Sequence, residues 1–337
     1  MPNTLTADFV HRQSAHCESG STSNLLSNYG LNVSEALAFG IGAGLFFGYF
    51  PFVKVHGLPL ITFRNAPGRI IKNTAKRLNV RVQCSKFRNP EKAMDALDAL
   101  LGRGIPVSLQ AGIYWLPYFP DVLRFHFNAH TLIAYGKKGS DYLISDPVFD
   151  KPVICSRDDL MKARFSEGVL APKGKMYHLT EIPKQIDLSQ AVRKGMKETC
   201  RLMIKTHFPL VGVRGIRLLA KRVREWPEKY GRRKAVLYLG HVIRMQEEVG
   251  TGGGGFRLMY AAFLQEAAGI MDNNGLLDIS KRMTEVGDKW REFALFGARI
   301  CKDRSKDGDN FDRLSDILLD CGNMEYALYK NLQEVIR

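Results

Sequence analysis

Three residues of this sequence could together perform nucleophilic chemistry: Cys17, His130 and Asp146. Cys17 lies in the segment SAHCESGSTSNLL, residues 14–26, just before small polar residues and an apolar helical pattern. We therefore expect Cys17 at the N-terminus of a helix, where the helix dipole and unpaired backbone N–H groups favour a thiolate. The same N–H groups could stabilise an oxyanion formed by attack on a carbonyl. Cys17 is thus the candidate nucleophile.

A base and its orienting acid follow later in the chain. His130 opens the apolar run HTLIAY, residues 130–135, and Asp146 closes the run YLIS, residues 142–145, just before Pro147. If these two runs are antiparallel strands, the carboxylate and the imidazole lie side by side, and the acid can fix the tautomer of the ring. The chain order of cysteine, histidine and aspartate is that of papain-like enzymes.

Each of these residues also has a simpler explanation. An isolated buried cysteine is usually inert, a histidine in a strand is usually a satisfied core residue, and Asp-Pro is a common turn. Zinc could instead be bound by His126 and His130 together with His16 and Cys17, but no closely spaced ligand pair supports this, and we expect no metal. The other cysteines lack the neighbourhood of Cys17 and suggest small apolar filler or surface thiols: Cys84, Cys155, Cys200, Cys301 and Cys321.

The elements that must position these residues change in character near residue 180. Before it, helical patterns near Ser21 and at 90–102 alternate with strand-like runs at 105–109, 131–135 and 142–145, and residues 136–140 are typical of a hairpin connection. After Pro183, amphipathic helical patterns cover about 189–206, 213–225, 228–248, 256–271, 276–302 and 309–335, broken by Pro209, Pro227 and a glycine run at 252–255. We therefore predict an α+β domain over residues 1–180 and a mostly helical domain over residues 181–337.

The chain is basic, with a formal net charge of +15 over 337 residues. Between Ala191 and Lys234, fourteen Lys or Arg residues face only three Glu residues, a net charge of +11. Such a segment could attract nucleic acid, an anionic membrane surface or an acidic protein, or it could be a solvated helix face. No nucleic-acid recognition motif accompanies it, so we do not expect nucleic acid as the partner.

The apolar segments and the cysteines indicate where in the cell the protein is expected. The most hydrophobic stretch, residues 36–52, is interrupted by four glycines and a proline and is shorter than the ~20 apolar residues of a spanning helix, so no membrane span is expected. Residues 1–13 show no continuous apolar stretch, and no secretory signal is expected. The absence of CxxC pairs among six cysteines favours reduced thiols and a cytoplasmic protein.

Several motifs resemble the butirosin-biosynthesis protein H family: HCESG at 16–20, GLNVSEA at 30–36, FGIGAGL at 39–45, HTL at 130–132, SDP at 145–147, GTGGGGFR at 250–257 and YAAFLQEA at 260–267. The resemblance covers nearly the whole chain. It implies a papain-like cysteine fold that moves an acyl group from an acyl carrier protein thioester onto a small-molecule amine. The acyl group would be carried on the phosphopantetheine of that carrier, with no other cofactor, and would pass through an acyl-enzyme on Cys17.

The resemblance also suggests further site residues. Papain-like relatives usually place an oxyanion-binding glutamine six residues before the cysteine, where this chain has His11, with Gln13 nearby. Glu18, next to the nucleophile, is a candidate for substrate binding. The helix after the glycine run carries three more candidates that could meet an amine or a phosphate, or could form structural ion pairs: Arg257, Tyr260 and Glu266. The run itself lacks the lysine of a P-loop, and either approaches the phosphopantetheine arm or connects helices.

Acyl carrier proteins are acidic, so the basic segment gains a candidate partner. The docking candidates are Arg214, Arg217, Lys221, Arg222 and Arg224. We expect the helical domain to dock the carrier and to cover the cleft, and it could also supply a homodimer interface. An apolar acyl pocket and ordinary core packing explain equally well the aromatic residues Phe46, Phe47, Tyr49, Phe50, Tyr114, Trp115 and Tyr118.

The alternative function is a cysteine hydrolase, either a peptidase or an amidase. It would use the same three residues with water as the acceptor, and sequence motifs do not distinguish the two acceptors.

Overall fold

A computed structural model describes residues 4–6, 8–55, 57–305 and 308–337, and divides the chain into two compact units. The first unit comprises Met1–Ala38 and Ile70–Ile186, and the second comprises Phe39–Arg69 and Asp187–Arg337. The last of the three breaks, between Ile186 and Asp187, falls close to the predicted boundary at residue 180. The segment Phe39–Arg69, which the sequence places in the N-terminal domain, lies instead in the second unit.

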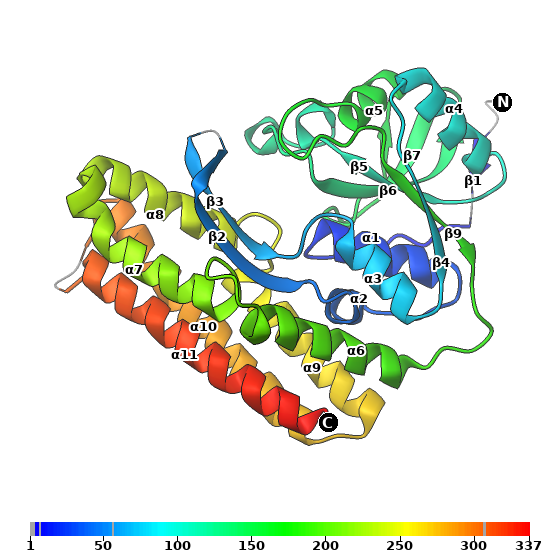
Figure 1. Cartoon of the computed structure of the whole chain (residues 1–337). Helices are drawn as coiled ribbons and strands as arrows, with labels where there is room; N and C mark the ends of the chain where they lie inside the picture. Colours follow the sequence, from blue (N-terminus) through cyan, green and yellow to red (C-terminus); the bar gives the residue numbers. More distant parts are fainter. Residues whose placement is uncertain (1–3, 7, 56, 306–307) are drawn as a thin grey trace. The chain divides into compact units, whose positions relative to one another are not determined.

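The first unit is built on an antiparallel sheet in the order β4-β9-β5-β6-β7-β8, with β1 also paired to β6 (Figure 1). The strands are β1 Thr4–Thr6, β4 Arg81–Ser85, β5 Val107–Ala111, β6 His130–Lys138, β7 Asp141–Ser145, β8 Val153–Cys155 and β9 Met176–Glu181. Gly139, at a φ of 64°, makes the tight turn between β6 and β7 that only a residue free of Cβ adopts easily. The expected hairpin is therefore present.

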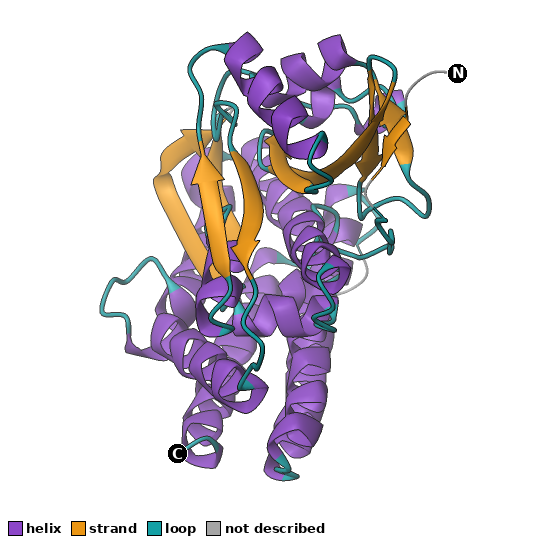
Figure 2. Cartoon of the chain, turned by 90° about the vertical axis from the view of Figure 1, so that its right-hand side faces the viewer, coloured by secondary structure: helices purple, strands orange, loops and turns teal. Residues whose placement is uncertain are grey.

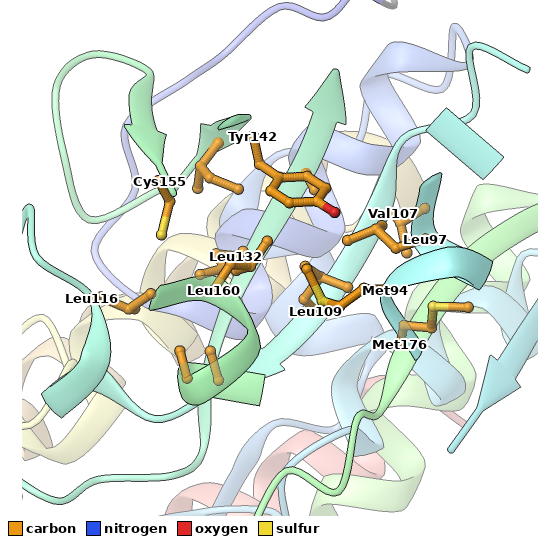
Figure 3. Close-up of a cluster of buried hydrophobic side chains, with 14 of the residues drawn as sticks. Met94, Leu97, Val107, Leu109, Leu116, Leu132, Tyr142, Cys155, Leu160 and Met176 are labelled. Atoms are coloured by element: carbon orange, nitrogen blue, oxygen red, sulfur yellow. The ribbon is translucent and has the colours of Figure 1, made fainter. Parts of the chain in front are cut away.

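The two faces of this sheet carry different helices (Figure 1). Leu109 on β5 and Leu132 on β6 enter a buried cluster with Met94 of α4 (Pro90–Leu101) and Leu160 of α5 (Arg157–Arg164), as Figure 3 shows. Figure 1 shows α1 (Cys17–Asn28) on the opposite face. Because side chains alternate along a strand, one face holds the apolar core while the other is free to receive the helix that carries Cys17.

Long helices form most of the second unit (Figure 2). They are α6 Leu188–Cys200, α7 Gly212–Tyr230, α8 Arg232–Glu247, α9 Arg257–Met271, α10 Gly275–Cys301 and α11 Phe311–Val335, with a π-helical turn at Arg201–Lys205. The sequence places a break at Pro227, but α7 continues through this residue to Tyr230 and ends at Gly231, which has a φ of 77°. Pro227 lacks an N–H and so removes one backbone hydrogen bond of α7, but it does not end the helix. The helix ends where the positive φ of Gly231 takes the backbone out of the helical conformation.

A two-stranded hairpin of β2 (Leu45–Val55) and β3 (Leu58–Arg64) belongs to the second unit for a packing reason. The rings of Phe47 and Phe63 lie 5.8 and 5.4 Å from Trp290 of α10, and all three side chains are buried. Tyr49 is likewise buried. Core packing therefore accounts for Phe47 and Tyr49, which the sequence had left open as acyl-pocket residues.

The glycine run at 252–255 is a close-packed connection between helices. All four glycines have positive φ values, from 57° to 85°. A Cβ on Gly255 would lie 2.5 Å from the ring of Phe63, and one on Gly254 would lie 3.1 Å from the carbonyl oxygen of Gly287. At Gly254 and Gly255 these contacts, together with the positive φ values, favour glycine over any larger residue.

The apolar stretch at 36–52 does not form a long helix. It contributes the last part of α2 (Glu35–Ile41) and most of β2. Among the described residues, no helix combines the length and the apolar character needed to cross a membrane.

Candidate active site

Cys17 is the first residue of α1, and its side chain is 7% exposed. The helix is capped by His16, whose extended backbone turns the chain into the helix and whose Nδ1 accepts a hydrogen bond from the N–H of Ser19 at 3.3 Å. The thiol therefore lies at the positive end of the helix, beside the N–H groups that have no intrahelical acceptor. The expected position at a helix N-terminus is the observed one.

Glu35, which the sequence did not single out, holds the turn that leads to this cysteine. Its carboxylate accepts hydrogen bonds from the backbone N–H of Ala15 at 2.9 Å and of His16 at 2.7 Å, and from Ser19 Oγ at 3.1 Å. Burial raises the pKa of Glu35, and these three hydrogen bonds partly offset that effect. No spacing rule connects Glu35 with Cys17, so only the folded chain reveals the contact.

His130 and Asp146 meet where β6 begins and β7 has just ended. Ile133 pairs with Ser145 across the two antiparallel strands, and His130 Nε2 lies 2.6 Å from Asp146 Oδ2. Both side chains are buried, at 3% and 0% exposure. The predicted strand arrangement thus produces the predicted pair.

The side chain of Cys17 also acts to raise the pKa of His130, so the thiol lies next to the ring and completes the cluster of three. Because Asp146 occupies Nε2, Nδ1 is the ring nitrogen that remains for the sulfur. Burial lowers the pKa of His130, but the charge and hydrogen bond of Asp146 and the interaction with Cys17 together raise it to about 10. The ring is therefore an imidazolium at neutral pH, a cation placed beside the sulfur of Cys17 at a helix N-terminus.

Two aromatic residues of the loop before β6, Tyr118 and Phe119, contact the pair of His130 and Asp146. The edge of Phe119 meets the ring of His130, with centroids 5.3 Å apart at 89°. The hydroxyl of Tyr118 donates to Asp146 Oδ2 at 3.0 Å. Burial, followed by the charge of Asp146, raises the pKa of Tyr118 well above its ordinary value, so that the hydroxyl stays protonated. The sequence suggested Tyr118 only as an aromatic residue of a pocket or of the core.

Neither of the two side chains suggested as oxyanion donors, His11 and Gln13, has contacts that support this role. His11 uses both ring nitrogens, one with Ser145 Oγ at 2.8 Å and the other with the carbonyl of Phe149 at 3.0 Å. It therefore ties the N-terminal segment to the end of β7. Gln13 is exposed and makes no side-chain hydrogen bond with another described residue. The backbone N–H groups at the start of α1 are the oxyanion donors that the geometry offers.

The carboxylate of Glu18 is bound by the N-terminus of a helix that lies later in the chain. Its Oε1 accepts hydrogen bonds from the N–H groups of Ile70 at 2.9 Å and Ile71 at 3.4 Å, at the start of α3 (Arg69–Arg77). Its side chain is 1% exposed. A carboxylate at a helix N-terminus accepts hydrogen bonds from unpaired N–H groups and is attracted by the positive end of the helix dipole. These contacts explain the burial of Glu18 without a role in substrate binding.

The three candidates on α9 lie in the second unit. Arg257 and Tyr260 are both 0% exposed, and Glu266 is half-buried. The guanidinium of Arg257 lies 2.9 Å from a carboxylate oxygen of Glu325 and also donates to the carbonyl of Gly255 at 2.7 Å. Arg257 is thus part of a buried structural ion pair, the simpler of the two readings that the sequence allowed.

The docking candidates lie along α7, and several already have partners. Arg224 bridges to Asp312 at 3.0 Å and to Asp316, and Arg222 bridges to Glu225 at 2.7 Å. The ammonium of Lys221 is 4.0 Å from Glu225. Arg214 and Arg217 are exposed and donate only to neutral groups among the described residues, the carbonyl of His207 and Asn323 Oδ1. Arg214 and Arg217 therefore offer the less neutralised positive charge.

No zinc-like cluster accompanies the site. Across the described part of the chain, no group of three or more His, Cys, Asp or Glu side chains is arranged to hold a metal ion. His126, one member of the zinc alternative, stacks on Tyr114 with centroids 4.3 Å apart.

Comparisons with known proteins place this site in a family. The family model described as Butirosin biosynthesis protein H, N-terminal, matches residues 16–147, which include all three residues of the cluster. The model described as Domain of unknown function (DUF4872) matches residues 158–332. A search of curated proteins gave no match.

Among solved structures, one described as a C39-like peptidase from Bacillus anthracis is 16% identical, with a TM-score of 0.37, over 54% of this chain and 100% of that one.

The DUF4872 match spans more than half of the chain, and the other match adds most of the first unit. This chain belongs to the DUF4872 family, and its residues 16–147 are similar to the N-terminal part of butirosin biosynthesis protein H.

Proposed function

We propose that this protein is a cysteine-dependent acyltransferase that moves an acyl group from the phosphopantetheine thioester of a carrier protein onto an amine. The observation that carries the proposal is the buried pair of His130 and Asp146, 2.6 Å apart, with Cys17 at a helix N-terminus close enough to raise the pKa of His130. The match to a butirosin biosynthesis protein points to the biosynthesis of natural products such as antibiotics.

In the first half-reaction, Cys17 attacks the carbonyl carbon of the thioester as the thiolate, the partner of the imidazolium of His130. A new carbon–sulfur bond forms to Cys17, the bond to the phosphopantetheine sulfur breaks, and the imidazolium of His130 gives its proton to that leaving sulfur. Because the pKa of His130 is raised to about 10, the ring carries this proton at neutral pH. The products are an acyl-enzyme and the free carrier thiol.

In the second half-reaction, the now neutral His130 accepts a proton from the incoming amine. The amine nitrogen bonds to the acyl carbon, the carbon–sulfur bond to Cys17 breaks, and the sulfur leaves as the thiolate partner of the imidazolium. An amide is released and the starting ion pair is restored. In both half-reactions the N–H groups at the start of α1 face the developing oxyanion.

The acidic surface typical of carrier proteins suits a basic docking site, and we infer that α7 contributes to it through Arg214 and Arg217. These two residues are favoured over Arg222 and Arg224 because the latter already face carboxylates. Electrostatic steering of this kind raises the association rate more than the final affinity.

The proposal is tested by intact-protein mass spectrometry after mixing the enzyme with acyl-loaded carrier proteins. We expect an added acyl mass on the wild type and on Cys84→Ala, which removes an exposed thiol, and none on Cys17→Ala. Addition of an amine should discharge the acyl group and yield the amide.

Two other outcomes would redirect the proposal. An acyl group that leaves Cys17 as fast in plain buffer as with amine would identify a cysteine hydrolase. An adduct that survives in Cys17→Ala but is lost in Cys84→Ala would contradict the assignment of Cys17 as the nucleophile.

A further inference from the structure

The loop between β5 and β6 packs two aromatic side chains directly on the histidine–aspartate pair. It passes through short 3-10 turns at Ile113–Trp115 and Asp121–Leu123, and Tyr118 and Phe119 lie between these turns. Phe119 is 7% exposed and meets His130 and Phe149 edge to face, with centroids 5.3 and 4.8 Å apart. Tyr118 also meets Phe149 edge to face at 5.4 Å. The loop is therefore fixed against the pair by aromatic contacts.

Tyr118 and His130 donate to the same oxygen. Asp146 Oδ2 accepts hydrogen bonds from His130 Nε2 at 2.6 Å and from the hydroxyl of Tyr118 at 3.0 Å. Among the described residues, Oδ1 accepts only the N–H of Val148, at 3.3 Å. Asp146 is 0% exposed, so protein groups and not bulk water must solvate its charge. A second donor on one oxygen fixes the carboxylate in orientation and draws part of the negative charge away from the imidazolium.

We propose that Tyr118 is a positioning residue of the catalytic cluster, which holds Asp146 toward His130 and moderates the attraction between the carboxylate and the imidazolium. Its importance for acyl transfer rests on the proposed function. Its effect on the cluster itself does not, because that effect can be measured by alkylation of Cys17 without any acyl donor.

Among the described residues, the titratable groups around the cluster come from several elements. His130 comes from β6, Cys17 from α1 and Cys155 from β8, and His11 approaches from the N-terminal segment through Ser145 and Phe149. His16 and Glu35 lie at the turn before Cys17. Burial raises the pKa of Cys155 to about 12, so this thiol stays neutral. The charge on Asp146 is therefore balanced mainly by His130 and by the hydroxyl of Tyr118.

The test is the pH dependence of Cys17 alkylation by iodoacetate, followed on the Cys17 peptide by mass spectrometry. Iodoacetate is an anion, so its reaction is fast while the imidazolium is present and slows as His130 loses its proton at high pH. Loss of the Tyr118 hydroxyl leaves more negative charge facing the imidazolium. In Tyr118→Phe we therefore expect this alkaline midpoint to rise by about half a pH unit to one unit.

Asp146→Asn should move the same midpoint in the opposite direction, because it removes the main group that stabilises the imidazolium. Tyr135→Phe is the matched control, since Tyr135 is a half-buried tyrosine of β6 whose hydroxyl donates to no other described residue. Its midpoint should equal that of the wild type.

A purely structural role for Tyr118 predicts a different result. Loosening the loop would weaken the bond between Asp146 and His130, and the midpoint would fall as it does in Asp146→Asn. A fall, or no change, in Tyr118→Phe would overturn the proposal. Because a midpoint does not depend on the amount of active protein, partial unfolding cannot imitate the expected rise.

Discussion

Each unit contains a buried charged pair. In the second unit, Arg257 and Glu325 are both 0% exposed, and in the first unit His130 is 3% exposed and Asp146 0%. Glu325 also accepts the indole N–H of Trp290 at 2.8 Å, and Arg257 also donates to the carbonyl of Gly255. His130 instead lies beside a carboxylate and the thiol of Cys17. The first pair is surrounded by groups that undergo no chemistry, and the second lies beside the residue that we propose as the nucleophile.

This difference shows that burial of charge does not by itself mark an active site. Both pairs exclude water, and in both the carboxylate has more than one hydrogen-bond donor. In the mechanism that we propose, the first unit differs because His130 can transfer its proton while Cys17 forms and breaks a bond to carbon. The predictions below separate the two roles, stability and reactivity, from the largest expected effect to the smallest.

Cys17→Ala should lower acyl transfer by about 10⁴-fold or more while leaving the fold intact, because it removes the nucleophile and only a small buried volume. The measurement is the rate of amide formation together with the thermal unfolding midpoint. Retained transfer activity in this variant would end the acyl-enzyme mechanism.

Arg257→Met should show the reverse pattern. It leaves the carboxylate of Glu325 buried with only Trp290 as a donor, so we expect a loss of about 3–5 kcal/mol in the free energy of unfolding, measured with urea. The rate of Cys17 alkylation in the folded protein should stay unchanged.

The double variant Arg257→Met with Glu325→Leu should recover most of this stability, since no unpaired charge then remains. A variant at Arg257 that stays stable but loses transfer activity would instead support the substrate-binding role that the resemblance suggested.

Asp146→Asn should slow acyl transfer by about 10²-fold without abolishing loading of Cys17, because the imidazole loses the group that orients and charges it. The same change should alter how stability depends on pH. The pKa of His130 is raised from 6.5 to about 10, so this interaction stabilises the fold fully below about pH 6.5. That contribution is lost as the pH rises through about 10.

Urea unfolding at several pH values should therefore show a steeper alkaline loss of stability in the wild type than in Asp146→Asn. Equal slopes would mean that Asp146 does not raise the pKa of His130.

The smallest expected effect concerns the surface of α7. Raising the ionic strength from low salt to a few hundred millimolar should lower kcat/KM for the carrier several-fold, because exposed charges are screened beyond about 10 Å at 0.1 M salt. Arg217→Glu should reduce kcat/KM and its salt dependence together. A small acyl thioester without a carrier protein serves as the control, and an equal salt effect on both donors would argue against docking by charge.

The sequence alone predicted the last three helices and the local positions of Cys17, His130 and Asp146. Helix periodicity and chain breaks predict α9, α10 and α11 to within a few residues, because these features depend on neighbours three or four positions apart. Cys17 before small polar residues, His130 before one strand and Asp146 after the next are also local patterns. The hairpin that joins the two strands then needs only a glycine turn to bring His130 and Asp146 together.

The tertiary structure decided which polar side chains are free and which are already paired. Glu18 belongs to the start of α3, 52 positions along the chain, and Arg257 belongs to Glu325, 68 positions along. Glu35 reaches the turn before Cys17, and Tyr118 reaches Asp146. These partners are set by how faces of different elements pack, and a polar residue has the same appearance in sequence whether its partner is a substrate, a helix end or a buried charge.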